Sequence, residues 1–244
     1  MSETALMWME IVFDVLYLIV VWALVGLMIR QRDIVPAAQQ PIARLTYWAF
    51  GLLALGDSGH VGFRVIAYAL GGLDRTPNIL GVNVSLVGVG AFATAVTITF
   101  FYVLMLEIWR VRFNQRYGIF EYVLFGAAVV RLALMLLPSN EWSQVTPPEP
   151  MGIIRNIPLM VQGLGLAYLI MRDALQKGDK PFIWIGVMIL ISYACYMPVI
   201  FFVNQLPMLG MLMMPKTMAY VGVAIIAYRD LYRSPAARQL AMAS

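Results

Sequence analysis

Long apolar runs recur along the whole chain and are separated by short polar connections. A helix that crosses the hydrocarbon core of a membrane needs about 20 consecutive, mostly apolar residues. Several runs reach that length, which leaves little of the sequence for a water-soluble core. The chain is 61% hydrophobic and only 12% charged, whereas a soluble domain typically carries about 25% charged residues. We therefore expect an all-α integral membrane protein.

Hydropathy predicts seven transmembrane helices, at residues 7–29, 45–70, 82–108, 120–137, 153–171, 182–203 and 206–228. Only Asn204 and Gln205 separate the last two, and Pro207 follows. The combined stretch is about twice the length that one spanning helix needs, so we expect a tight helical hairpin there. Residues 1–244 are then a single seven-helix transmembrane domain with no soluble output domain.

Lysine and arginine collect in every second connection and in the tail: Arg30, Arg32 and Arg44; Arg110, Arg112 and Arg116; Arg172, Lys177 and Lys180; Arg229, Arg233 and Arg238. Short cytoplasmic loops hold the excess of basic residues. We therefore expect the N-terminus outside, the C-terminus in the cytoplasm, and a multi-pass protein of the cytoplasmic (plasma) membrane. The acidic start, with Glu3 and Glu10, is unlike a cleavable signal peptide, so the first helix is expected to stay in the mature protein.

The composition excludes several kinds of site. The chain has one histidine, His60, and one cysteine, Cys195. A multi-histidine zinc site, bis-histidine haem ligation and an intrachain disulfide are therefore impossible within it, and we expect no metal or haem. The net charge of +4 is explained by basic residues beside the membrane. No basic stripe alternates with aromatic residues, so a nucleic-acid partner is not expected.

Ionisable residues inside membrane helices are costly and usually face the interior of the bundle, where they mark functional sites. Two polar sets each fall on one face of a predicted helix: Glu10, Asp14 and Tyr17 on the first, and Asp57, His60 and Arg64 on the second. If these faces meet, Asp14 and Arg64 lie at a similar depth. We expect an ion pair between them, which would offset part of the cost of burying either charge.

Three more cations, Arg131, Arg155 and Lys216, fall in the outer half of the membrane in this topology. With the arginine of the second helix, they outnumber the two membrane aspartates. The sequence therefore predicts a water-accessible cavity that opens to the outside and is cationic on balance. Its floor is expected near Asp57, His60 and Lys216.

Lys216 directly follows Pro215 in the last predicted helix. Proline removes a backbone hydrogen bond and kinks a helix, so we expect a kink beside the lysine. Tyr193, Tyr196 and Tyr220 are expected to form an aromatic wall around it. A buried lysine of this kind suits Schiff-base or general-base chemistry. The alternative is a lysine that extends to the membrane surface or pairs with the aspartate of the second helix.

The first functional hypothesis is a module that binds, senses or transports an amphipathic or anionic small molecule or a lipid. The expected ligand-binding residues are Asp14, Arg64, Arg131, Arg155, Lys216, Tyr193, Tyr196 and Tyr220. A second hypothesis is an intramembrane enzyme that acts on a lipid-like substrate, with Asp57 and His60 as acid and base. A third is a structural subunit that assembles with other membrane subunits or with copies of itself.

In length, helix number, orientation and a lysine on the last helix, the chain resembles the microbial rhodopsins. The resemblance implies retinal bound at Lys216, with Asp14 or Asp57 as counterion. The chain departs from that family in two ways. Its third predicted helix lacks the carboxylate, arginine and tryptophan expected near a Schiff base, and Lys216 lies closer to the outer end of its helix.

Overall fold

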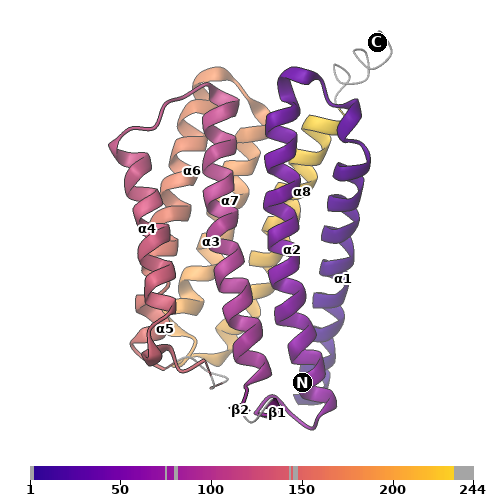
Figure 1. Ribbon diagram of the computed structural model, residues 1–244, viewed down its shortest axis with the longest axis vertical. Helices are drawn as coiled ribbons and strands as arrows, with labels where there is room; N and C mark the ends of the chain where they lie inside the picture. Colours follow the sequence, from indigo (N-terminus) through magenta and orange to yellow (C-terminus); the bar gives the residue numbers. More distant parts are fainter. Residues whose placement is uncertain (1–2, 75, 80–81, 143, 145–147, 234–244) are drawn as a thin grey trace.

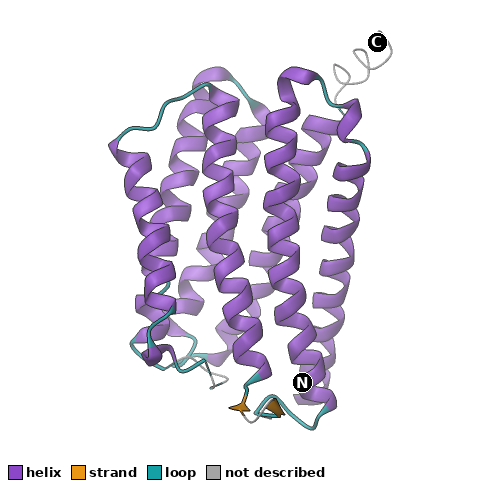
Figure 2. Cartoon of the chain, in the orientation of Figure 1, coloured by secondary structure: helices purple, strands orange, loops and turns teal. Residues whose placement is uncertain are grey.

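The computed structural model describes residues 3–74, 76–79, 82–142, 144 and 148–233. The fold is helical apart from one two-stranded hairpin (Figure 2). The long helices are α1 (Glu3–Arg30), α2 (Gln40–Ala69), α3 (Leu86–Phe113), α4 (Ile119–Met135), α6 (Ile157–Lys177), α7 (Lys180–Phe202) and α8 (Met213–Tyr232). The short elements are α5 (Met151–Ile154), the 3-10 turns η1 (Arg32–Ile34), η2 (Ala37–Gln39), η3 (Pro138–Asn140) and η4 (Pro207–Leu212), and the antiparallel strands β1 (Asn78–Ile79) and β2 (Val82–Asn83).

The long helices run side by side along the long axis of the molecule (Figure 1). Each packs on its neighbour in the chain, and α1 also packs on α8, which closes the bundle. The end of α1, the α3–α4 connection and the start of α7, which carry Arg30, Arg116 and Lys180, lie at the upper end in Figure 1, which we call the basic end. The hairpin and α5 lie at the other, which we call the α5 end. The alternating distribution of basic residues in the sequence thus becomes a difference between the two ends of the bundle.

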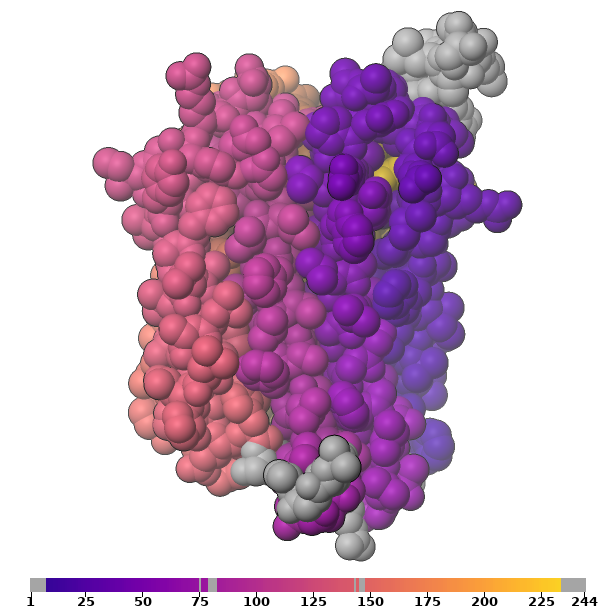
Figure 3. Space-filling model, viewed as in Figure 1, coloured from indigo at the N-terminus to yellow at the C-terminus, as the bar shows by residue number. Residues whose placement is uncertain are grey.

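The outward surface of the helices is apolar. On α4, Val129, Val130 and Leu136 are exposed by 66%, 52% and 76%, and the face made by α1 to α4 is shown in Figure 3. In water, this much exposed apolar area is rare outside interaction sites. Within the described residues, five helical segments are long and apolar enough to cross a membrane: 8–30, 86–113, 151–177, 180–202 and 207–232. These features support an all-α membrane protein.

Two long helices are outside this set of five. α4 has only 17 residues, and α2 carries Asp57, His60 and Arg64 among its apolar residues. Both nevertheless lie alongside the other helices, and α4 is the shorter of the two (Figure 1).

α2 and α3 approach each other closely through glycines. A methyl group added at Gly90 would lie 2.8 Å from the Cα of His60 and 3.0 Å from the carbonyl oxygen of Gly59. A methyl group at Gly56 would lie 3.1 Å from the Cα of Thr94. Small residues at such points let two helix backbones come together in a membrane. This contact holds the polar face of α2 against α3.

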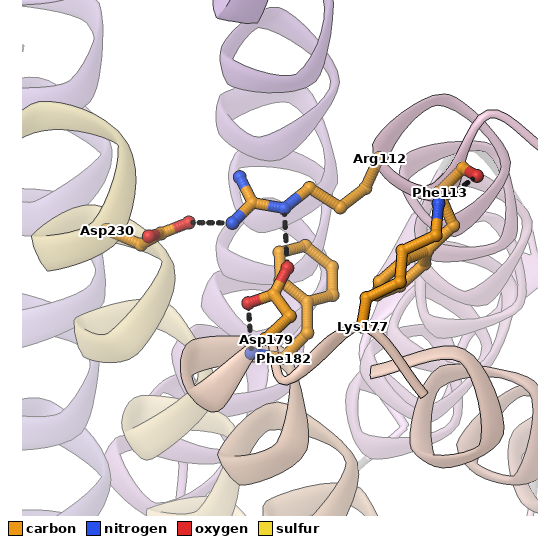
Figure 4. Close-up of polar contacts among 6 residues, drawn as sticks. All are labelled: Arg112, Phe113, Lys177, Asp179, Phe182 and Asp230. Carbon is orange, nitrogen blue, oxygen red and sulfur yellow. Dashed lines mark hydrogen bonds and ion pairs between the residues drawn. The ribbon is translucent and has the colours of Figure 1, made fainter. Parts of the chain in front are cut away.

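At the basic end, Arg112 joins three helices (Figure 4). Its Nε lies 2.8 Å from Asp179 Oδ2, its Nη2 lies 3.2 Å from Asp230 Oδ2, and its guanidinium stacks 4.9 Å from the ring centre of Phe182. Asp179 also caps α7, because its other carboxylate oxygen accepts a hydrogen bond from the Phe182 backbone N–H at 3.3 Å. Lys177 donates to the Phe113 carbonyl oxygen at 2.7 Å. These contacts fix α3, α7 and α8 at this end.

The structure differs from the sequence prediction around Pro215. The last helix begins at Met213, after the 3-10 turn η4, and so Pro215 occupies its first turn. A proline in the first turn removes no helical hydrogen bond, because the backbone N–H groups there have no partner within the helix. The expected kink beside Lys216 is therefore replaced by a helix start.

Candidate functional site

A cavity of about 630 Å³ lies between the helices near the α5 end. Residues of α1, α2, α3, α7 and α8 line it, together with α5, η4 and the segment 149–156. Along α2, α3 and α8, the lining residues nearest the basic end are Leu53, Ile98 and Tyr220. Tyr220 packs against Phe101, with ring centres 5.6 Å apart, and an aromatic core continues from there toward the basic end. The cavity is therefore closed toward the basic end.

Asp57 is held on the cavity wall by two hydroxyl groups. The Tyr17 phenol donates to Asp57 Oδ2 at 2.6 Å, and the Thr94 hydroxyl donates to Asp57 Oδ1 at 2.6 Å. The three residues come from α1, α2 and α3. Hydroxyl donors to both oxygens fix the orientation of the carboxyl group.

Arg64 and Glu10 form the ion pair that links α1 to α2 near the α5 end. Arg64 Nη2 lies 2.7 Å from Glu10 Oε1. The sequence predicted Asp14 as the partner of Arg64, and the structure instead uses the carboxylate one helical turn closer to the N-terminus. Asp14 lines the cavity and is partly buried. It forms no hydrogen bond or ion pair with any side chain in the described part of the chain.

Lys216, from α8, also lines the cavity and lies over the ring of Tyr196. Its Nζ is 4.0 Å from the ring centre, a cation–π geometry. The Tyr196 hydroxyl donates to Asn156 Oδ1 at 3.1 Å, which ties α7 to the start of α6. Within the described residues, Lys216 has no ion-pair partner, so the expected alternative of a pair with Asp57 is not formed.

Arg155 also lines this side of the cavity. Its guanidinium stacks on Trp142, 4.3 Å from the ring centre, and Nη1 donates to Asn140 Oδ1 at 3.3 Å. No described carboxylate pairs with it. Its contacts orient the guanidinium but leave its charge uncompensated.

Arg131 and Tyr193, which the sequence placed in the ligand site, lie behind the cavity wall. Arg131 is only 3% exposed and donates to Thr99 Oγ1 at 3.1 Å and to Asn156 Oδ1 at 3.4 Å. Tyr193 donates to the Leu159 carbonyl oxygen at 2.8 Å. Neither lines the cavity: Arg131 is on α4, which supplies no lining residue, and the Tyr193 hydroxyl is bonded to α6. Arg131 contacts the cavity only indirectly, through its hydrogen bond to the lining residue Asn156.

Tyr220 is the third tyrosine of the expected aromatic wall, and it does line the cavity. Its hydroxyl shares a hydrogen bond with that of Tyr102 at 2.7 Å. The cavity floor is thereby hydrogen-bonded to the aromatic core of α3.

Asp57 and His60 both line the cavity but do not form an acid–base pair. Both Asp57 oxygens accept hydrogen bonds from the hydroxyls of Tyr17 and Thr94, and the buried His60 Nδ1 has no partner among the described residues. No cluster of histidine, cysteine or carboxylate side chains suited to a metal ion occurs in the described ranges. The enzyme hypothesis gains no support from this arrangement.

The sequence analysis missed three residues that shape the site: Asn156, Asn140 and Trp142. Asn156 contacts both Arg131 and Tyr196, while Asn140 and Trp142 orient Arg155. Asn140 and Trp142 lie in the connection between α4 and α5. Hydropathy does not predict where the side chains of such a connection lie relative to the helices. The one available signal was the Arg155-Asn156 pair at the start of an apolar run.

Two sets of polar side chains in the cavity lining can be told apart by the helices that carry them. The acidic wall comprises Asp14, Asp57, Tyr17 and Thr94; the cationic wall comprises Lys216, Arg155, Tyr196 and Asn156. The full lining holds Glu10, Asp14, Asp57 and Glu149 against Arg64, Arg155 and Lys216. The lining is therefore not cationic on balance, which differs from the prediction made from the sequence. Carboxylates and cations both line it.

Comparison of this chain with protein-family models, with curated proteins and with solved structures finds no match.

Proposed function

We propose that this protein is a seven-helix, multi-pass protein of the plasma membrane whose cavity opens to the outside and binds an amphipathic small molecule or lipid through its anionic group. The observation that carries the proposal is the cationic wall. Lys216 and Arg155 line a cavity of about 630 Å³ and have no carboxylate partner among the described residues. Unpaired charges in a largely apolar site are costly, and a bound anion would offset that cost.

The size and lining of the cavity support this ligand class. Small-molecule sites are typically about 300–1,000 Å³, mostly apolar, with a few placed polar groups. Here Phe13, Ile200 and Met214 are among the apolar lining residues. Methionine adapts to irregular apolar shapes. An acyl or alkyl portion would contact these side chains while the anionic group contacts Lys216 and Arg155.

The arrangement of the helices supports seven crossings with the N-terminus outside. The connections α1–α2, α3–α4 and α6–α7 meet at one end of the bundle and carry the basic residues (Figure 1). Basic connections mark the cytoplasmic side. The α5 end, where the cavity lies, is then the outer end. α4 exposes apolar side chains along its length, as a lipid-facing helix does.

Binding of dioctanoyl phosphatidylglycerol to the detergent-purified protein, measured by native mass spectrometry, tests the proposal. We expect Lys216→Met and Arg155→Gln each to weaken binding about tenfold, the value of one charge-assisted contact. Lys180→Met, an exposed position at the basic end, is the matched control and should bind as the wild type does. Equal affinity in all four proteins would show that the cationic wall does not hold the anion.

A further inference from the structure

Within the described residues, no cation forms an ion pair with Asp14 or Asp57. Asp14 lines the cavity and forms no hydrogen bond or ion pair with the side chains described. Glu10 lies one turn away on α1 and forms an ion pair with Arg64, whose Nη2 is 2.7 Å from Glu10 Oε1. Asp57 is satisfied by hydroxyl groups only. Hydroxyls supply hydrogen bonds to a carboxylate but do not neutralise its charge.

The unpaired carboxylate and the unpaired cations belong to one cavity. Asp14 comes from α1, whereas Lys216 comes from α8, the helix that packs beside α1 and closes the bundle. Lys216 and Asp57 are close enough to interact electrostatically, but no ion pair joins them among the described contacts. A ligand with only negative charge would satisfy one wall and be repelled by the other.

A ligand with both charges would satisfy both walls. We propose that the occupant of this cavity is a zwitterion, whose ammonium group is accepted by Asp14 and whose phosphate or carboxylate is held by Lys216 and Arg155. The inference rests on the proposed function, because it concerns the same cavity and the same anionic contact. It adds a positive charge to the ligand and assigns Asp14 as the residue that binds it.

Two sources supply this chemistry: the headgroup of an amine-bearing phospholipid, and a free apolar amino acid. Side chains of α1, α2 and α3 form the acidic wall, and side chains of α7, α8 and the Arg155-Asn156 segment form the cationic wall. Either ligand would lie across the cavity with its ammonium toward α1.

The test uses two pairs of probes that differ only in the ammonium group. The lipid pair is dioctanoyl phosphatidylethanolamine and its N-acetyl derivative, and the free pair is leucine and 4-methylpentanoate. Binding to the full-length purified protein is measured for wild type, Asp14→Asn, Asp14→Glu and Lys216→Met. Asp74→Asn, an exposed carboxylate at the same end of the bundle, is the matched control.

We expect the wild type and Asp74→Asn to bind the ammonium-bearing member of at least one pair about tenfold more tightly than its partner. Asp14→Asn should abolish that preference while still binding the member without ammonium, and Asp14→Glu should retain it. Lys216→Met should weaken both members. The pair that shows the preference identifies the source of the ligand.

Two results would overturn the inference in different ways. If both members of each pair bind the wild type equally, or if Asp14→Asn keeps the preference, the zwitterion is wrong while the proposed anion site stands. If no probe of either pair binds, the proposed function and the inference are both wrong.

Discussion

The Tyr17 phenol donates a 2.6 Å hydrogen bond to Asp57 Oδ2 and thereby joins α1 to α2 at the side of the cavity. Tyr17 is only 6% exposed. A buried hydrogen bond to a charged group contributes about 1.5–3 kcal/mol to stability. The contact therefore serves both the packing of α1 and the orientation of the carboxylate.

Replacing Tyr17 with phenylalanine should lower the free energy of unfolding by about 2 kcal/mol, because one oxygen of a buried carboxylate loses its donor. In an Asp57→Asn background the same change should cost about 1 kcal/mol, since the lost bond is then between neutral groups. Thermal unfolding in detergent gives the four values of this double-mutant cycle. Equal losses in both backgrounds would mean that the hydrogen bond does not couple the two residues.

Gly90→Ala should destabilise the protein by about 1–3 kcal/mol, the usual cost of overpacking. The added methyl group would meet the backbone of α2 at His60, which cannot move aside as a side chain can. Gly62→Ala is the matched control, because nothing lies within 4 Å of the position its methyl group would take. A similar melting temperature for both variants would contradict the close approach of α2 and α3.

Arg112→Met should destabilise the basic end by about 2 kcal/mol, because Asp179 and Asp230 lose their cation. Arg116→Met is the control: Arg116 is exposed and forms no ion pair with the described residues. Adding Asp230→Asn to Arg112→Met should restore part of the loss, since it removes a partly buried charge without a partner. Chemical unfolding that ranks the double variant below Arg112→Met would contradict this view of the network.

The proposed topology of seven spans predicts which connections a membrane-impermeant maleimide reaches from outside. In a Cys195→Ser background, single cysteines replace exposed residues of five connections, Ala38, Asp74, Arg116, Ser139 and Gln205, and Gln176 in the last turn of α6. We expect labelling in intact cells at positions 74, 139 and 205. Positions 38, 116 and 176 should react only after permeabilisation. Labelling of 116 and 139 from the same side would show that α4 does not cross the membrane.

Much of the helical layout could be predicted from hydropathy, because apolar runs of membrane length leave few alternatives. The first predicted helix, 7–29, lies within α1 (Glu3–Arg30), and the sixth, 182–203, nearly coincides with α7 (Lys180–Phe202). The largest differences are near prolines. Hydropathy began the last helix at residue 206, whereas α8 begins at Met213, because the Pro207–Leu212 segment is apolar but forms a 3-10 turn.

The site could be predicted as a set of residues but not as a set of contacts. Helical spacing put Glu10 and Asp14 on the same face, one turn apart, and both were within reach of Arg64. The tilt and depth of α1 relative to α2 decide between them, and spacing within one helix does not determine either. Arg131 shows the same limit, since its burial depends on how α4 packs against α6.

The most direct test of an outward anion-binding cavity is the identity of the molecule that co-purifies with the protein. Mass spectrometry of the material released by denaturing the wild type should find one amphipathic molecule with a phosphate or carboxylate group, at close to one per chain. The Lys216→Met/Arg155→Gln double variant should release at least tenfold less, as expected when charge-assisted contacts are lost. Equal release of the same molecule from both proteins, or release of one without an anionic group, would contradict the account.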